Sequence, residues 1–377
     1  MTANYASSKK MIHPLTSFRA FGAVFVMLYH YRNKFDLSLQ DHIPALEFGY
    51  LGVDAFFILS GFIIFHTYGD QFSNTTSVSV RTFFVRMFNF LVARIARVYP
   101  VHLFVLVLYG LYVLGGLLLL KDPNLDPYSG KQFLAQIVLV HGWNFDNSTS
   151  FSWNPVSWSI SAEWYAYLLF PFLIFLVFRL RAIAFHVAII VGCISAAFLF
   201  VSTIESNQLQ EHGILRMSLE FPLGASLCVI WHRVGDAKVP WDGIAVLSFL
   251  SFGTYLSVTA PLPQSPHIQT LGNQGLVLIF LALLIISLAS SRGFVLRALS
   301  QRTMIVFGEI SYSIYMVHYF IGVHILDYVH SKTGSAIPGL FGYFGAIGVT
   351  IIVSYMMYRW IEVPARRYIR GHFYIKT

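Results

Sequence analysis

Long uninterrupted apolar runs are the feature that most constrains what this chain can fold into. One of them, residues 103–120, reads LFVLVLYGLYVLGGLLLL. Crossing about 30 Å of hydrocarbon takes roughly 20 apolar residues of helix, and every backbone polar group in lipid must be paired. The runs lack the alternation of apolar and polar residues that marks a membrane β-strand. The sequence therefore predicts membrane-spanning helices.

The composition supports this prediction and excludes other classes. Only 11% of the residues are charged and 56% are hydrophobic, whereas soluble domains carry roughly 25% charged residues. The net charge of +8 comes from basic residues divided among short segments between apolar runs, which is not a nucleic-acid-binding face. Cys193 and Cys228 both fall in apolar segments and are expected to pack as small hydrophobic residues. No zinc motif is present, so no metal is expected.

We expect an all-α, polytopic helix bundle with about ten transmembrane helices, forming one domain over residues 1–377. Lys and Arg are enriched in cytoplasmic loops, and a cytoplasmic N-terminus places most of the 25 basic residues inside. Both termini are then cytoplasmic, and Arg216 is expected in an outer loop. Residues 131–141 are too short an apolar run to cross and are expected to form an interfacial or re-entrant helix. The expected spans are 15–33, 50–68, 98–120, 158–178, 183–203, 214–231, 242–259, 273–290, 304–327 and 338–360.

Arg19 and His30 lie within the first span, where ionisable groups are costly and usually functional. They are eleven residues apart, so they share one helix face and are separated by about 16 Å along the axis. The structural alternative is that His30 reaches the outer interface while Arg19 pairs with a neighbouring helix.

Asp54, near the start of the second span, is a carboxylate at membrane depth and needs a basic partner or water. The following Ser60-Gly61 step favours close helix packing, because small residues let helices approach. Together with Trp158, Tyr315 and His318, Asp54 is assigned to substrate binding or structural support.

A basic, aromatic-rich segment precedes the third span. Arg94 and Arg97 end its run of arginines, and Pro100 is expected to open the next helix, where its missing N–H is harmless. The segment suits anchoring to anionic lipid headgroups. The forked donors of arginine also match phosphate oxygens, so the same residues are candidates for binding an acyl donor such as coenzyme A.

Glu163 follows a cluster of Trp and Ser residues at the start of the fourth span. We expect it near the outer interface at the depth of His30, where a carboxylate would orient the imidazole as an acid–base pair. In the ninth span, Ser311, Tyr315 and His318 are spaced to form a polar stripe on one helix face. Hydrogen bonding between helices is the simpler explanation of that stripe.

In combination these motifs resemble acyltransferase family three, the bacterial membrane O-acyltransferases that modify O-antigen and exopolysaccharide. The shared motifs extend from residue 19 to residue 364. Arg94-Ile-Ala-Arg97 departs from a closer Arg-x-Arg arrangement, and no appended hydrolase-like domain is expected. The motifs are Arg19-x10-His30, the Gly-Val-Asp-x-Phe-Phe-x-Leu-Ser-Gly-Phe stretch from Gly52, the arginine run ending Arg97-Val-Tyr-Pro, the Trp-Ser-x-Ser-x-Glu run ending at Glu163, Ser-Tyr-Ser-Ile-Tyr-x-x-His from Ser311, and Glu362-x-Pro364.

The resemblance implies a multi-pass protein of the inner (plasma) membrane that transfers an acyl group, most simply acetyl from cytoplasmic acetyl-CoA, to a hydroxyl of an extracytoplasmic glycan or glycolipid. His30 and Glu163 would be catalytic, and Arg19, Arg94 and Arg97 would bind the donor. Because donor and acceptor lie on opposite sides, the acyl-pantetheine arm must reach through the bundle or an acyl group must be relayed. The alternatives are a transporter or flippase of a lipid-linked glycan, for which inverted repeats are expected but not found, and a sensor or scaffold without chemistry.

Overall fold

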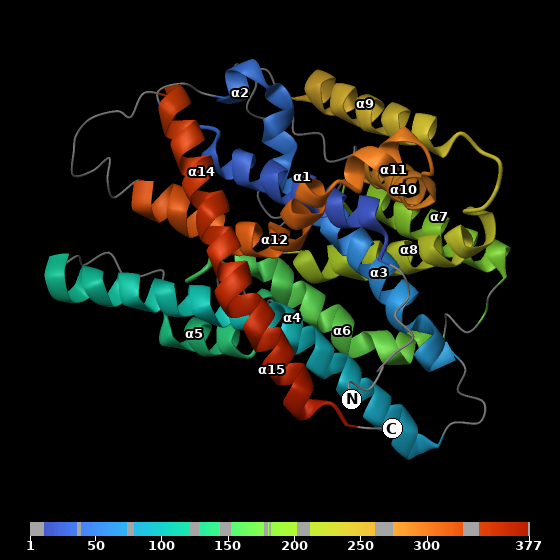
Figure 1. Cartoon of the computed structure of the whole chain (residues 1–377), viewed down its shortest axis with the longest axis horizontal. Helices are drawn as coiled ribbons and strands as arrows, with labels where there is room; N and C mark the ends of the chain where they lie inside the picture. Colours follow the sequence, from blue (N-terminus) through green and yellow to red (C-terminus); the bar gives the residue numbers. More distant parts are fainter. Residues whose placement is uncertain are drawn as a thin grey trace.

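The computed structural model is a bundle of helices that cross one another at many angles (Figure 1). It describes residues 11–35, 39–73, 79–120, 128–143, 152–176, 180, 182–201, 212–260, 274–326 and 339–375. The basic residues Lys121, Arg179, Arg181 and Lys332 lie outside these ranges. Every regular element in the described ranges is helical, which confirms the predicted all-α class.

In the described ranges, ten helices of 17 residues or more each overlap one expected span. Six helical stretches among these residues are long and apolar enough to cross a membrane, which makes this a multi-pass membrane protein. The number of crossings and the side of the termini stay predictions. The ten are α1 (His13–Tyr31), α3 (Gly52–Ser73), α4 (Val80–Gly115), α6 (Trp158–Leu176), α7 (Ile183–Val201), α8 (Gly213–Val234), α9 (Trp241–Thr259), α10 (Gln274–Ser290), α12 (Arg302–Tyr319) and α14 (Gly339–Met357).

Short elements connect these helices. The interfacial segment expected at 131–141 is a short helix, α5, followed by a 3-10 turn that begins at His141. Wide π-type turns extend α4, α12 and α14, and the last of them leads into α15 at the C-terminal end. The short elements are α2 (Leu39–His42), η1 (Pro44–Leu51), η2 (Gly116–Leu120), α5 (Gly130–Ile137), η3 (His141–Trp143), η4 (Pro155–Ser157), α11 (Phe294–Leu299), η7 (Phe320–Ile325), η8 (Tyr358–Glu362) and α15 (Val363–Phe373).

The basic segment and the third span form one continuous helix, so the expectation that Pro100 opens a new helix is wrong. The helix begins where the Ser79 side chain accepts a hydrogen bond from the Thr82 N–H, 3.2 Å away. Pro100 lies inside it, a position that membrane helices tolerate when neighbours satisfy the freed carbonyl. At 36 residues, α4 is about 54 Å long, well beyond the roughly 30 Å of hydrocarbon. Its arginine-rich first half can therefore extend past the apolar layer.

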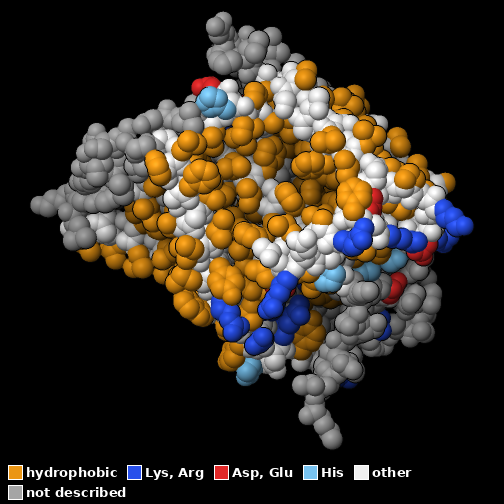
Figure 2. Space-filling model, turned by 45° about the horizontal axis from the view of Figure 1, so that its top comes forward, with side chains coloured by type: hydrophobic (Ala, Val, Ile, Leu, Met, Phe, Trp, Pro, Cys, Tyr) orange, Lys and Arg blue, Asp and Glu red, His pale blue; other side chains and the backbone are white. Residues whose placement is uncertain are grey.

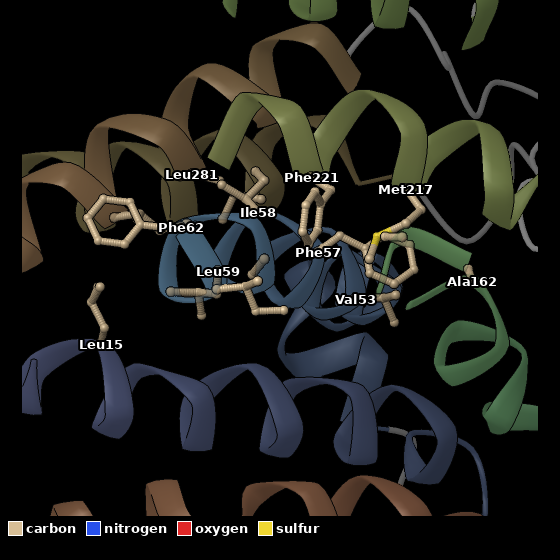
Figure 3. Close-up of a cluster of buried hydrophobic side chains, with 14 of the residues drawn as sticks. Leu15, Val53, Phe57, Ile58, Leu59, Phe62, Ala162, Met217, Phe221 and Leu281 are labelled. Atoms are coloured by element: carbon tan, nitrogen blue, oxygen red, sulfur yellow. The ribbon is translucent and has the colours of Figure 1, made fainter. Parts of the chain in front are cut away.

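The core forms where α3 and α8 pack side by side. Phe57 of α3 and Phe221 of α8 are each 2% exposed and lie next to each other between the helices (Figure 3), and Phe62 of α3 is fully buried. A methyl group on Gly61 would overlap the Phe221 carbonyl, which confirms the packing role expected of this step. Helix α1 packs equally closely along α12.

The outer surface fits a membrane. Figure 2 shows a face covered mostly by hydrophobic side chains, with Lys and Arg side chains gathered along one edge. Exposed large apolar residues continue along α4, α9 and α14, for example Leu111 at 60%, Leu247 at 66% and Phe344 at 73%. Exposing that much hydrocarbon to water would cost free energy, whereas exposing it to lipid does not.

Candidate active site

A buried cavity with a volume of about 130 Å³ lies where five helices converge. Three guanidinium groups and one carboxylate line it, together with hydroxyl groups and an apolar wall. Its charged residues are Arg19 from α1, Arg94 and Arg97 from α4, and Glu163 from α6. Its hydroxyl-bearing residues are Ser60, Ser159, Tyr167, Ser311, Tyr312 and Tyr315.

Arg94 is held largely by aromatic rings. Its guanidinium carbon lies 5.1 Å from the ring centre of Tyr68 and 5.8 Å from that of Tyr167, and one terminal nitrogen donates to the Tyr68 hydroxyl at 3.1 Å. The Arg94 Nε is buried and has no hydrogen-bond partner among the residues that the structure describes. A buried donor left unpaired costs free energy, so the pattern favours an anionic or carbonyl ligand at Arg94.

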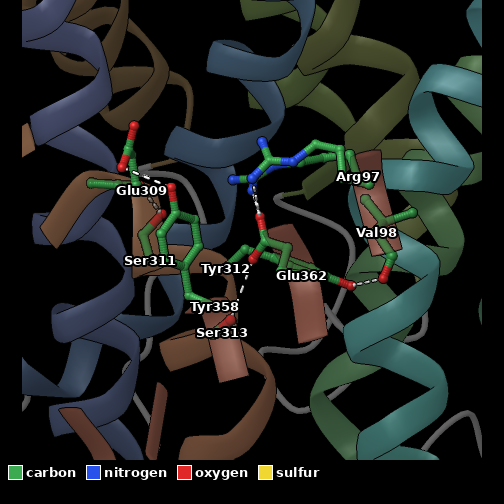
Figure 4. Close-up of polar contacts among 10 residues, drawn as sticks. Arg97, Val98, Glu309, Ser311, Tyr312, Ser313, Tyr358 and Glu362 are labelled. Atoms are coloured by element: carbon green, nitrogen blue, oxygen red, sulfur yellow. Dashed lines mark hydrogen bonds and ion pairs between the residues drawn. The ribbon is translucent and has the colours of Figure 1, made fainter. Parts of the chain in front are cut away.

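Arg97 is compensated by protein instead. It forms an ion pair with Glu362, whose side chain is fully buried. Arg366 lies 3.3 Å from the same carboxylate, and the Ser313 hydroxyl donates to its other oxygen at 3.3 Å. Figure 4 shows this carboxylate between Arg97 and Ser313. The two arginines therefore differ. Arg97 is paired with a buried carboxylate, whereas the Nε–H of Arg94 is available to donate to a ligand.

Glu163 lies in this cavity and does not reach His30, so the expected His30–Glu163 pair is not formed. The Ser60 hydroxyl donates to Glu163 Oε1 at 2.5 Å, and both residues share the cavity with Arg19. The start of α6 is enclosed by its neighbours, which places Glu163 beside α3 and the arginines. Ser157, Ser159 and Ser161 are all buried, so the helix begins inside the bundle and Glu163 lies one turn deeper.

His30 instead meets the polar stripe of α12. His30 Nδ1 lies 3.1 Å from His318 Nε2, and the two ring centres are 5.1 Å apart. The stripe predicted from the spacing of Ser311, Tyr315 and His318 does face inward, and all three are buried. Its members divide between two places: Ser311 and Tyr315 line the cavity, and His318 contacts His30.

Tyr315 connects these two places. Its hydroxyl donates to the Val156 carbonyl at 2.8 Å and lies 2.7 Å from Ser159 Oγ. Its ring centre is 5.8 Å from that of His318. The cavity wall and the histidine contact are therefore adjacent along α12, one helical turn apart.

Asp54 has the basic partner that its depth requires. Arg216 of α8 binds both carboxylate oxygens, at 2.6 and 3.3 Å, and Glu220 lies 4.0 Å from the same guanidinium. Trp158 covers this group, with the Arg216 guanidinium carbon 5.3 Å from its ring centre. The expectation of Arg216 in an outer loop is wrong, because it is 3% exposed within a helix. Neither Asp54 nor Trp158 lines the cavity, which favours structural support.

Other residues of the site were not singled out from the sequence. Ser60 was assigned to packing, yet it donates to Glu163. Tyr312 lines the cavity, and its hydroxyl donates to the Val98 carbonyl at 2.6 Å (Figure 4). The available signals were hydroxyl groups at membrane depth next to recognised motifs, and Glu362 was already part of one motif. Single polar residues of this kind occur on many helices, so the sequence does not rank them.

Two further features contain different chemistry. Within the described ranges, His66, Cys228 and His232 place three potential metal-ligand atoms within 4.8 Å of one another, but none of them lines the cavity. A second cavity, of about 490 Å³, lies against α1, α9 and α10 and is lined only by apolar residues and glycine. Neither feature shares a residue with the arginine-lined cavity.

Comparison with known proteins decides the family. The profile of the acyltransferase domain family, acyltransferase family 3, matches residues 13–359, which is nearly the whole chain. The chain belongs to this family. No solved structure matches it.

Curated relatives of this acyltransferase family member include the O-acetyltransferase OatA of two Staphylococcus aureus strains, NCTC 8325 / PS 47 and COL. Each is 27% identical over 97% of this chain. The chain spans about 60% of the length of these relatives. The match supports O-acyl transfer as the chemistry to test in the cavity and at the histidine contact.

Proposed function

We propose that this chain is a membrane O-acyltransferase of the inner (plasma) membrane. It would move an acetyl group from cytoplasmic acetyl-CoA to a hydroxyl of an extracytoplasmic glycan or glycolipid. The observation that carries the proposal is the arginine-lined cavity that adjoins, through Tyr315, the buried contact of His30 with His318. Acyl transfer from a thioester to a hydroxyl uses both a site for the anionic donor and a base.

The donor is assigned to the arginine-lined cavity. Arg19, Arg94 and Arg97 outnumber Glu163 among its charged groups, and the Nε of Arg94 supplies a donor for an anion or for an amide carbonyl of the pantetheine arm. At about 130 Å³ the cavity has room for part of the pantetheine arm, whose thioester end would extend toward His30. The nucleotide would remain outside, near the basic first half of α4.

The reaction needs one base. His30 would take the proton of the acceptor hydroxyl as its oxygen attacks the thioester carbonyl carbon; the carbon–sulfur bond then breaks, and the thiolate receives that proton from the imidazolium. The products are the O-acyl acceptor and coenzyme A with a free thiol. No cysteine lines the cavity, which favours direct reach of the pantetheine arm over a cysteine-borne relay.

Transfer of radiolabel tests the proposal. Purified protein in lipid vesicles is given acetyl-labelled acetyl-CoA outside, on the arginine side, and polysaccharide or glycolipid acceptors on either side. Label should appear as base-labile ester on the acceptor. The matched control is His372→Gln, because His372 is exposed on α15 and its loss should leave transfer unchanged. Acceptor transport without esterification would instead support the flippase alternative and overturn the proposal.

A further inference from the structure

The contact between His30 and His318 joins α1, which contains the proposed base, to α12. Helices α1 and α12 pack closely along their length, and Gly308 lies against the Thr16 carbonyl, where a methyl group would overlap it. The Tyr31 hydroxyl donates to the His318 carbonyl at 2.8 Å. His318 is fully buried, while His30 is half-buried. The two rings are therefore held at a fixed separation by the backbone on both sides.

The hydrogen-bond partners of His318 fix where its proton lies. His318 Nδ1 is 3.2 Å from the Ile314 carbonyl oxygen, which can only accept. The Nδ1 atom must therefore carry the hydrogen, and in a neutral imidazole the other nitrogen is then an acceptor. His318 accordingly presents a lone pair on Nε2 to His30. This assignment follows from the network of acceptors and not from observed hydrogens.

The same accounting fixes His30. Its Nδ1 lies 3.0 Å from the Val26 carbonyl oxygen and 3.1 Å from His318 Nε2. Both neighbours are acceptors, so His30 Nδ1 carries the hydrogen and shares it between them. In the described part of the chain no hydrogen bond involves His30 Nε2. The lone pair of His30 is thus placed on Nε2, away from α12.

We propose that His318 is a positioning residue that holds His30 in the tautomer with a bare Nε2, so that Nε2 is the base in acyl transfer. This inference rests on the proposed function of His30. When Nε2 takes the proton of the acceptor hydroxyl, His30 becomes an imidazolium and its Nδ1–H bond to His318 becomes charge-assisted. A neutral histidine thus does here what a carboxylate does in hydrolase triads.

The Val26 carbonyl alone does not fix the orientation of the His30 ring. It lies four residues before His30 on the same helix and also accepts the backbone bond of the helix. The ring can leave it by rotating about its side-chain bonds without disturbing α1. His318 approaches from a different helix, with its Nε2 3.1 Å from His30 Nδ1, so a ring rotated away from α12 loses this second acceptor.

Two variants separate positioning from packing. His318→Leu keeps a similar volume but removes the acceptor, and we expect turnover to fall roughly ten- to hundredfold, the effect of one charge-assisted bond. His318→Gln can place an amide oxygen near the position of Nε2, and it should restore turnover to within a few-fold. Donor affinity should stay unchanged in both, because His318 does not line the arginine cavity.

Nitrogen NMR of histidine-labelled protein tests the tautomer directly. The chain has 14 histidines, so the His30 signals are assigned by their loss in His30→Gln. In the unsubstituted protein His30 should show a protonated Nδ1 and a bare Nε2. His318→Leu should give a mixture of tautomers, and His318→Gln should restore the single one.

The outcomes distinguish the two levels of the argument. A His30 ring protonated on Nε2 in the unsubstituted protein would overturn the positioning role, whatever the activity. Equal turnover of His318→Leu and His318→Gln would overturn it as well. If His30→Gln retains full transfer, the assignment of His30 as base fails instead, and the tautomer measured by NMR shows separately whether His318 fixes the ring.

Discussion

The arginine-lined cavity and the histidine contact handle buried polar groups in opposite ways. The cavity gathers full charges and compensates most of them: Arg97 by Glu362, Arg94 by aromatic faces, and Glu163 by Ser60. The histidine contact contains two rings whose partners are carbonyl oxygens and each other. A charged cavity holds an anion, whereas a neutral ring with a fixed lone pair accepts a proton.

The separation between the two regions is set by α1. Arg19 and His30 are eleven residues apart on this helix, about 16 Å along its axis. Under the proposed function, a donor bound at the arginines would extend along α1 to bring its thioester to the histidine. Donor binding and proton transfer should therefore respond separately to substitutions in the two regions.

The largest expected effect is at the histidine contact. His30→Ala should lower turnover by roughly 10²- to 10⁴-fold, the usual contribution of a general base, while donor affinity stays unchanged. Turnover is measured by transfer of labelled acetyl groups and affinity by equilibrium binding of acetyl-CoA. Loss of donor binding in this variant would break the comparison, because it would place His30 in the donor site.

Next comes the support behind Arg97. Glu362→Gln leaves the buried Arg97 guanidinium without its counter-charge, and breaking a buried ion pair costs about 3–5 kcal/mol. Thermal unfolding in detergent should show a clear loss of stability. Glu47→Gln is the matched control, since Glu47 and Arg32 form a pair at 3.0 Å with each side chain 22% exposed, and such pairs contribute about 0–1 kcal/mol. Equal losses in the two variants would contradict the buried-support role.

Arg94→Gln should weaken acetyl-CoA binding by roughly ten- to hundredfold, the effect of one hydrogen bond to a charged group. Turnover at saturating donor should change much less, because His30 is untouched. The control is Arg297→Gln, an exposed position on α11. If binding is unchanged in Arg94→Gln, the basic first half of α4 serves only as an anchor to anionic lipids.

The smallest expected effect sharpens the comparison most. Glu163→Gln keeps an oxygen for Ser60 but removes the negative charge from the arginine cavity. Binding of the anionic donor should become a few-fold tighter, because a repulsive charge is lost, and turnover should fall modestly. Unchanged donor affinity, with a turnover loss as large as that of His30→Ala, would show that Glu163 acts with His30 after all.

Much of this architecture is predictable from local patterns. Apolar runs fix where helices form, because only helices satisfy the backbone in lipid over such lengths, and every expected span has its helix. The residue types of the candidate site were also predictable. An ionisable group in lipid is costly without a partner, which singles out Arg19, His30, Arg94, Arg97 and Glu163. The inward stripe of α12 followed from helical spacing alone.

The tertiary structure decided which polar residues contact each other. Glu163 belongs with Ser60 and the arginines because the start of α6 is buried within the bundle, and the depth of a helix end depends on its neighbours, not on its own sequence. Asp54 finds Arg216 because α3 and α8 pack closely at their glycines. His30 faces His318 across 288 residues of chain. A sequence periodicity fixes the face of one helix, but partners across helices depend on rotation, depth and tilt, which only packing of the whole bundle sets.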